Sequence, residues 1–138
     1  MKNIRGKNKR RSLEHDEQVA LFQWAKLQEK KYPGLAYMFA IPNGGARNIV
    51  TATRLKAEGV RAGVPDIFLP FVKRQIDGPG NQCGGLFIEM KSGKNKVTPD
   101  QARYHNWLSC AGYSVIVCYS WGDAKNGILD YLTGGKKC

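Results

Sequence analysis

Two carboxylates and a lysine stand at the ends of two apolar segments of the sequence. Asp66 directly precedes the apolar run 67–69, and Glu89 lies within the run 86–90, two residues before Lys91. A carboxylate on a buried strand is costly to remove from water, so it normally has a cation beside it, either a metal ion or a lysine. The same residues also fit an ordinary Glu89–Lys91 ion pair on a solvated face of a sheet. Both alternatives are open at this point.

The two apolar runs are joined by one loop and can pair as an antiparallel hairpin, which would bring Asp66 beside Glu89 and Lys91. Two carboxylates at one end of a sheet make a site of hard oxygen ligands suited to Mg²⁺ or Mn²⁺. A lysine there can hold a water molecule or offset the charge of a phosphate. These groups are the minimum for metal-assisted hydrolysis of a phosphodiester, because a metal polarises the phosphate and helps to generate hydroxide from water.

Glu17 is the third acidic residue of interest. Its neighbours at i+3, i+4 and i+7 are Ala20, Leu21 and Trp24, which places it within the apolar stripe of a predicted helix. This position predicts that Glu17 points towards the end of the sheet and reaches a metal directly or through water. A glutamate in the first turn of a helix can also simply complement the helix dipole.

The elements that must position these residues follow from the apolar pattern and from the stop signals along the chain. We predict helices at 14–31, 49–58, 99–110 and 123–132, and strands at 35–41, 66–72, 86–91 and 113–119. The stretch 73–85 is polar and rich in glycine, which is typical of a loop. The order α-β-α-β-β-α-β-α indicates one α/β domain over residues 13–138, with helices flanking a mixed central sheet.

The chain is strongly basic. It has 138 residues, and 22 Lys and Arg against 11 Asp and Glu give a net charge of +11. Six of the basic residues lie within the first eleven positions, so we predict that residues 1–12 form a flexible basic arm. A field of this sign favours a polyanionic partner, nucleic acid first and an anionic membrane second. A solubilising tail is the alternative.

Membrane insertion and secretion are not expected. The longest uncharged apolar run, 35–41, has seven residues, which is too short to span a membrane. No apolar segment follows the basic start, as it would in a signal peptide. We therefore expect an intracellular, cytoplasmic protein without a membrane partner.

Several motifs occur in a specific order: Pro42-Asn43-Gly44-Gly45 with Arg47, Gly59, Gly63-Val64-Pro65-Asp66-Ile67, Glu89-Met90-Lys91 and Gln101. This order resembles the VRR-NUC family, the virus-type replication and repair nucleases of the PD-(D/E)xK superfamily. A lone D…ExK pattern is short and common, whereas the whole succession is far more specific. The resemblance extends over about residues 14–120 and implies a restriction-endonuclease-like fold.

The resemblance also implies a metal-dependent DNA nuclease. Asp66 and Glu89 would bind Mg²⁺ or Mn²⁺ together with the backbone carbonyl of Met90. Lys91 would orient the attacking water or stabilise the pentavalent phosphate, and Glu17 would be an outer ligand of the metal or of its water.

The roles of two residues on the helix at 99–110 are less direct. Gln101 has a catalytic role by the resemblance, but it can equally be explained as the partner of Thr98 in a capping box. His105 lies four residues later on the same helical face. A lone histidine at such a place is more often structural than catalytic.

A group of backbone amides and cations near the predicted site is expected to contact DNA: Asn43, Gly44, Gly45, Arg47, Lys94, Lys96, Arg10 and Arg11. Glycines let backbone amides approach a phosphate closely, and an arginine can bind it with two hydrogen bonds. The segment around Gly44 could also be only a tight turn, and Lys94 and Lys96 could belong merely to a solvated loop.

Stand-alone members of the family look like phage or bacterial proteins, and small nucleases of this superfamily often resolve branched DNA as homodimers. A Holliday junction has two symmetric cleavage points, which a two-fold dimer matches. The expected protein is therefore a homodimeric endonuclease for branched DNA in a bacterial or phage-infected cell. The alternatives are a flap or end-processing nuclease and a non-catalytic basic DNA-binding module.

Overall fold

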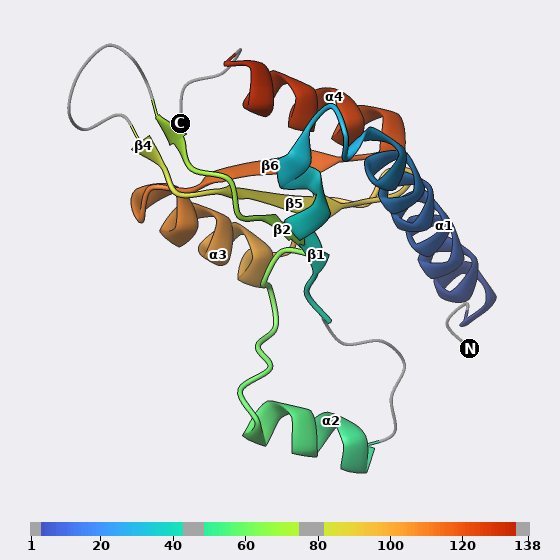
Figure 1. The fold of residues 1–138 in the computed structure, drawn as a ribbon. Coiled ribbons are helices and arrows are strands. Elements are labelled where there is room, and N and C mark those ends of the chain that lie inside the picture. The colour runs from blue at the N-terminus through green and yellow to red at the C-terminus, as the bar shows by residue number, and fades with distance from the viewer. Residues whose placement is uncertain (1–3, 43–48, 75–81, 135–138) are drawn as a thin grey trace.

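The computed structural model describes residues 4–42, 49–74 and 82–134, which form a sheet with helices on both faces (Figure 1). The sheet has the order β1-β2-β5-β6, with β1 at Phe39–Ala40, β2 at Ile67–Leu69, β5 at Leu86–Met90 and β6 at Ser114–Cys118. The pairs β1–β2 and β2–β5 are antiparallel, and β5–β6 is parallel. The predicted α/β fold with a mixed central sheet is confirmed.

The hydrophobic core lies on one face of this sheet. Helices α1 (Ile4–Gln28) and α4 (Trp121–Thr133) pack against each other there, and α3 (Pro99–Cys110) covers part of the opposite face (Figure 1). Many residues of the core are at most 2% exposed, among them Leu21, Ala25, Ile67, Leu69, Leu86, Ile88, Met90 and Ile128. Because strand residues alternate between faces, Phe87, Glu89 and Lys91 of the β5 segment point to the side of α3.

Local signals set the ends of three helices. Thr98 and Gln101 form the predicted capping box of α3, with Thr98 N donating to Gln101 Oε1 at 2.9 Å and Gln101 N donating to Thr98 Oγ1 at 3.2 Å. Helix α2 (Ile49–Ala57) ends two residues before Gly59, which has a φ of +100°. Helix α4 begins two residues earlier than predicted, because Ser120 caps it by accepting a hydrogen bond from the amide of Asp123.

Helix α1 differs most from its prediction. It begins at Ile4 rather than at about residue 14, so residues 4–12 of the predicted flexible arm are helical. Lys and Arg are favourable helix residues, and no proline interrupts the segment, so the basic stretch extends the helix. The core-facing stripe of α1 then continues through Leu21 and Ala25 as expected for an amphipathic helix.

Two other segments also differ from their predictions. The first three residues of the strand predicted at 35–41 belong to a 3₁₀ helix, η1 (Pro33–Tyr37), because Pro33 suits the start of a helical turn; only β1 is a strand within this range. The predicted loop 73–85 contains a small antiparallel pair, β3 (Lys73–Arg74) and β4 (Gln82–Cys83). Within the described ranges, no helix is long and apolar enough to cross a membrane.

Candidate active site

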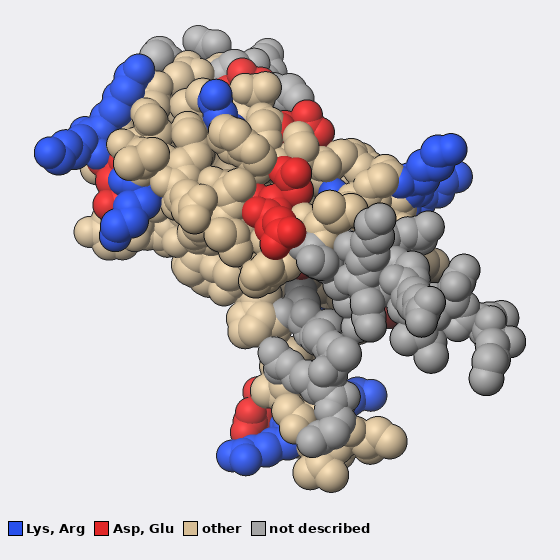
Figure 2. Space-filling model, turned by 90° about the vertical axis from the view of Figure 1, so that its right-hand side faces the viewer, with Lys and Arg blue, Asp and Glu red and all other residues tan. Residues whose placement is uncertain are grey.

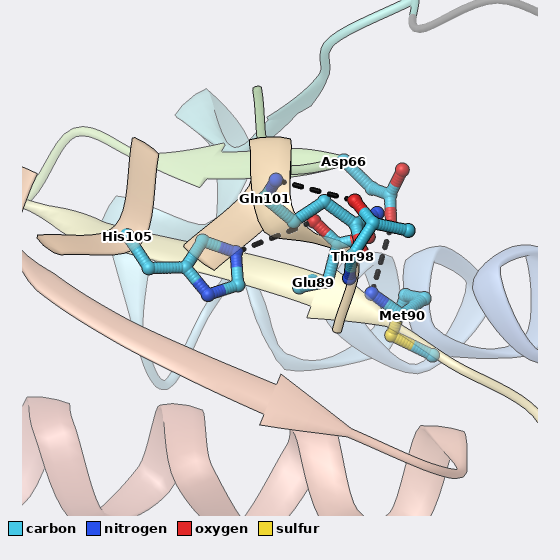
Figure 3. A network of polar contacts seen from close by, with 6 residues as sticks. All are labelled: Asp66, Glu89, Met90, Thr98, Gln101 and His105. Atoms are coloured by element: carbon cyan, nitrogen blue, oxygen red, sulfur yellow. Dashed lines mark hydrogen bonds and ion pairs between the residues drawn. The ribbon is translucent and has the colours of Figure 1, made fainter. Parts of the chain in front are cut away.

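The antiparallel pairing of β2 with β5 places Asp66 beside the end of β5. Ile67 lies opposite Ile88, and the amide of Asp66 donates to the carbonyl of Ile88 at 3.0 Å. In return, the amide of Met90 donates to Oδ2 of Asp66 at 2.8 Å (Figure 3). The predicted hairpin geometry is confirmed, and Asp66, Glu89 and Lys91 share one end of the sheet.

Glu89 is almost completely buried and is held from α3. Its residue exposure is 2%, and Oε1 accepts a hydrogen bond from Gln101 Nε2 at 2.8 Å (Figure 3). Gln101 therefore closes the capping box and binds the predicted metal-binding carboxylate at the same time. The other oxygen, Oε2, is buried and has no hydrogen-bond partner among the described residues; it lies 3.6 Å from His105 Nε2.

The environment of the two carboxylates disfavours their charged forms. Burial raises the pKa of Glu89 to about 8, and the charge of Asp66 raises it as well, while Lys91 opposes the shift. Burial is also the main cause that raises the pKa of Asp66, against the lowering effect of its hydrogen bond from Met90. Burial lowers the pKa of His105, as does the positive charge of Lys91.

These residues fit a divalent metal ion. A cation between Asp66 and Glu89 would favour the ionised form of both, and Oε2 of Glu89 would gain a partner. Within the described ranges, no three His, Cys, Asp or Glu side chains cluster as a full ligand set. Mg²⁺ does not need such a cage, because it is usually bound through one or two carboxylates and keeps several waters.

Gly63 fixes the distance between the strand that follows Asp66 and the helix that carries Gln101. It has a φ of +91°, and a Cβ atom there would lie 2.6 Å from the carbonyl carbon and oxygen of Asp100. Only glycine therefore lets the segment Gly63–Asp66 lie against the first turn of α3. This contact gives the glycine of the G-V-P-D motif a structural reason.

The structure does not bring Glu17 to the site. Its Oε2 accepts a hydrogen bond from the amide of Trp121 at 2.6 Å, at the start of α4. A carboxylate at that place stabilises the helix N-terminus. Glu17 is also not among the residues that line the cleft described below.

Glu14, which the sequence analysis did not single out, lies at the site instead. Its Oε1 accepts hydrogen bonds from the amide and the hydroxyl of Ser92 and from Asn95 Nδ2. Its negative charge contributes to raising the pKa of Asp66 and of Glu89. The signal in the sequence was its spacing: Glu14 precedes the fully buried Leu21 by two helical turns.

The carboxylates lie in an open cleft of about 1590 Å³ between α1, α2, the segment 60–64, the end of β5 and the start of α3. Helix α2 forms the outer wall and stands away from the body of the molecule (Figure 1, Figure 2). None of its side chains is buried. Five cations line the cleft: Lys26, Lys56, Arg61, Lys91 and Arg103.

The predicted DNA contacts have mixed positions. Lys94 and Lys96 are exposed in the loop that follows Lys91, but they do not line the cleft. Arg10 and Arg11 belong to the first turns of α1. Asn43, Gly44, Gly45 and Arg47 lie outside the described residues.

Comparisons with known proteins agree with the motifs. The family model of the VRR-NUC domain matches residues 7–121. A solved structure described as a VRR_NUC domain protein matches with a TM-score of 0.71 and 27% sequence identity, covering 90% of this chain and 91% of that chain. No match is found among curated proteins.

The matched range includes the residues that the structure gathers at the cleft: Glu14, Asp66, Glu89, Lys91 and Gln101. The family match extends over most of the chain, and the structural match covers nearly all of both proteins. VRR-NUC domains form a family of nucleases. This chain belongs to the VRR-NUC domain family of nucleases.

Proposed function

We propose that this nuclease cleaves DNA phosphodiester bonds with Mg²⁺ or Mn²⁺ held by Asp66 and Glu89. The observation that carries the proposal is the pair of carboxylates in the cleft, half-buried Asp66 and buried Glu89, with Oε2 of Glu89 lacking a hydrogen-bond partner among the described residues. Unpaired buried carboxylates are unfavourable unless a cation joins them. The backbone carbonyl of Met90, at the end of the same strand, is the proposed third ligand.

The remaining residues act on the substrate or on the carboxylates. The metal, when bound, would polarise the phosphate and lower the pKa of a water molecule. Lys91 lines the cleft on the same strand face as Glu89, so its ammonium would offset the charge of the pentavalent phosphate. Gln101 holds Oε1 of Glu89. We assign to Glu14 the outer role that the sequence predicted for Glu17, because Glu14 lines the cleft.

The size of the cleft and the cations on its walls support a polymeric anion as substrate. Its volume of about 1590 Å³ exceeds the roughly 300–1,000 Å³ typical of sites for small molecules. The cations along its walls would contact successive phosphates of a strand. The net charge of +11 would add attraction at longer range.

We further propose that the enzyme is a homodimer acting on branched DNA such as a Holliday junction. Helix α2 has nine residues, buries none of them, and leaves Ile49 84% and Val50 77% exposed. So short a helix is marginal in water by itself, so contact with DNA or with a second copy would stabilise it. Two sites related by a two-fold axis would face the two equivalent strands of a junction.

The test compares wild-type protein with Asp66→Asn and Glu89→Gln on labelled four-way junction, flap and linear duplex DNA, in Mg²⁺, Mn²⁺ or EDTA. We expect paired, metal-dependent nicks on opposing strands of the junction and little cutting of duplex. The cleavage rate of each variant should fall by more than the roughly 10- to 100-fold that outer partners of a metal site contribute. DNA binding should be kept. Sedimentation should give a mass near twice 15.4 kDa.

Other outcomes would reject parts of the proposal. Efficient cutting of flaps but not of junctions by a monomer would show an end-processing nuclease. Binding without any metal-dependent nick would show a non-catalytic module. Full activity of Asp66→Asn or Glu89→Gln would exclude these carboxylates as metal ligands.

A further inference from the structure

We propose that His105 is a positioning residue whose Nε2–H holds the second oxygen of Glu89, so that α3 fixes both oxygens of this carboxylate. The inference rests on the proposed function, because it concerns the same carboxylate. It goes beyond that function by assigning a role to a residue outside the D…ExK motif.

The first observation is a pair of buried polar atoms that face each other. Nε2 of His105 and Oε2 of Glu89 are 3.6 Å apart, and their side chains are 14% and 3% exposed (Figure 3). Neither atom has a hydrogen-bond partner among the described residues. Buried polar groups are normally paired, and a movement of a few tenths of an ångström would pair these two with each other.

The second observation is the position of His105 on α3. It follows Gln101 by four residues, so both side chains project from the same face of the helix towards Glu89 (Figure 3). Gln101 already holds Oε1, and its own place is set by the capping box with Thr98. The first two turns of α3 therefore place both side chains against the carboxylate of Glu89.

The third observation separates positioning from direct contact with substrate. Glu89 and Gln101 line the cleft, but His105 does not. The imidazole thus lies behind the carboxylate as seen from the cleft. From there its Nε2–H would fix the side-chain torsion of Glu89 through one lone pair of Oε2, and the second lone pair of that oxygen stays free for a metal. Partners of this kind orient metal-binding side chains.

The experiment measures Mn²⁺ binding to DNA-free protein by isothermal titration calorimetry and, separately, the Mg²⁺ concentration for half-maximal cleavage. The variants are His105→Leu, which removes the donor, and His105→Gln, whose Nε2 stands at a similar distance from the backbone. Asn106→Leu is the matched control, because it places the same apolar side chain on the exposed face of α3. Melting temperatures check that each variant is folded.

We expect His105→Leu to weaken Mn²⁺ binding about 10- to 100-fold and to shift the Mg²⁺ requirement in the same direction. His105→Gln should stay within a few-fold of wild type, and Asn106→Leu should not change. If His105→Leu does not fold, the comparison of His105→Asn with His105→Gln replaces it, since the asparagine amide is one bond too short to reach Oε2.

Unchanged Mn²⁺ binding in His105→Leu, or equal losses in the leucine and glutamine variants, would overturn the inference. In the first case the hydrogen-bond donor of His105 would have no role in metal binding. In the second case the imidazole ring itself would be required, either for packing or as a direct metal ligand. These results leave the proposed function intact as long as wild type binds Mn²⁺ and cuts DNA. A wild-type protein that does neither would overturn both.

Discussion

Glu14 accepts two hydrogen bonds from Ser92, one from its amide at 3.1 Å and one from its hydroxyl at 3.2 Å. The contact joins the first helix to the loop that directly follows Lys91, across 78 positions of sequence. Glu17, less than one turn further along α1, instead accepts a hydrogen bond from the amide of Trp121 at the start of α4. Two glutamates of one helix therefore bind two different elements, the loop after Lys91 and the start of α4.

These contacts predict that one of two matched substitutions lowers cleavage and that the other lowers stability. Glu14→Gln should lower cleavage about 10- to 100-fold, since it changes the charge beside Asp66 and Glu89 and weakens the hold on the loop. Glu17→Gln should leave cleavage at saturating Mg²⁺ unchanged but lower the free energy of unfolding by about 1 kcal/mol, because α4 loses a charged cap. Single-turnover cleavage and urea unfolding measure the two effects. The reverse pattern would return the outer catalytic role to Glu17.

The raised pKa of Glu89 predicts how the stability of the metal-free protein depends on pH. The folded protein keeps the proton of Glu89 up to a pKa of about 8, whereas the unfolded chain releases it near 4.5. The free energy of unfolding should therefore fall as pH rises from about 5 to 8, by at most about 1.4 kcal/mol per pH unit. Urea unfolding in EDTA at several pH values measures this slope.

Two controls accompany the pH measurement. Glu89→Gln cannot titrate at this position, so its slope over the same range should be smaller; Asp66 retains a contribution because its pKa is raised too. Mg²⁺ should also reduce the slope of wild type, because a bound cation favours the ionised carboxylates. Equal slopes for wild type and Glu89→Gln in EDTA would mean that Glu89 is not protonated in the folded protein.

Gly63 predicts a specific sensitivity next to the G-V-P-D motif. Gly63→Ala would place a Cβ atom 2.6 Å from the Asp100 carbonyl, so the segment before Asp66 must move away from α3. Gly59→Ala is the matched control, since Gly59 also has a positive φ but no atom within 4 Å of its Cβ position. The control should cost only the left-handed strain of about 1–2 kcal/mol. Gly63→Ala should cost more and also lower cleavage; equal behaviour of the two variants would exclude this contact as important.

The basic residues among the first eleven positions predict a large share of the salt dependence of DNA binding. Replacing the six cations of residues 1–11 by glutamine removes their charge and keeps favourable helix residues within α1; the positions are Lys2, Arg5, Lys7, Lys9, Arg10 and Arg11. The slope of log K against log salt should become shallower by up to about 5, at about 0.9 per phosphate contact. Turnover at saturating DNA should be kept. A slope equal to that of wild type would show that this segment does not touch DNA.

Much of the site could be read from the sequence because its geometry is local. Strand alternation places Glu89 and Lys91 on one face, and a single loop between the two strands makes the antiparallel pairing of Asp66 with the end of β5 the simplest arrangement. The start of α3 is predicted by Pro99 at the first helical position and by the capping box of Thr98 and Gln101, which needs no distant partner. For these residues, the local signals and the tertiary fold agree.

Other features depended on which surfaces pack together. Glu14 and Glu17 differ by only about 60° around α1, so the packing of α1 against α4 decides which of them faces the loop at Ser92. The same holds for Gln101, for which the sequence left a cap and a catalytic role open: it forms the cap and also donates a hydrogen bond to Glu89, because α3 lies over the end of β5. Hydrophobic periodicity predicts which face of a helix is buried, but it does not separate two residues that are one turn apart on that face. Which carboxylate meets the site is decided only by the contacts that set the rotation of that helix against the sheet.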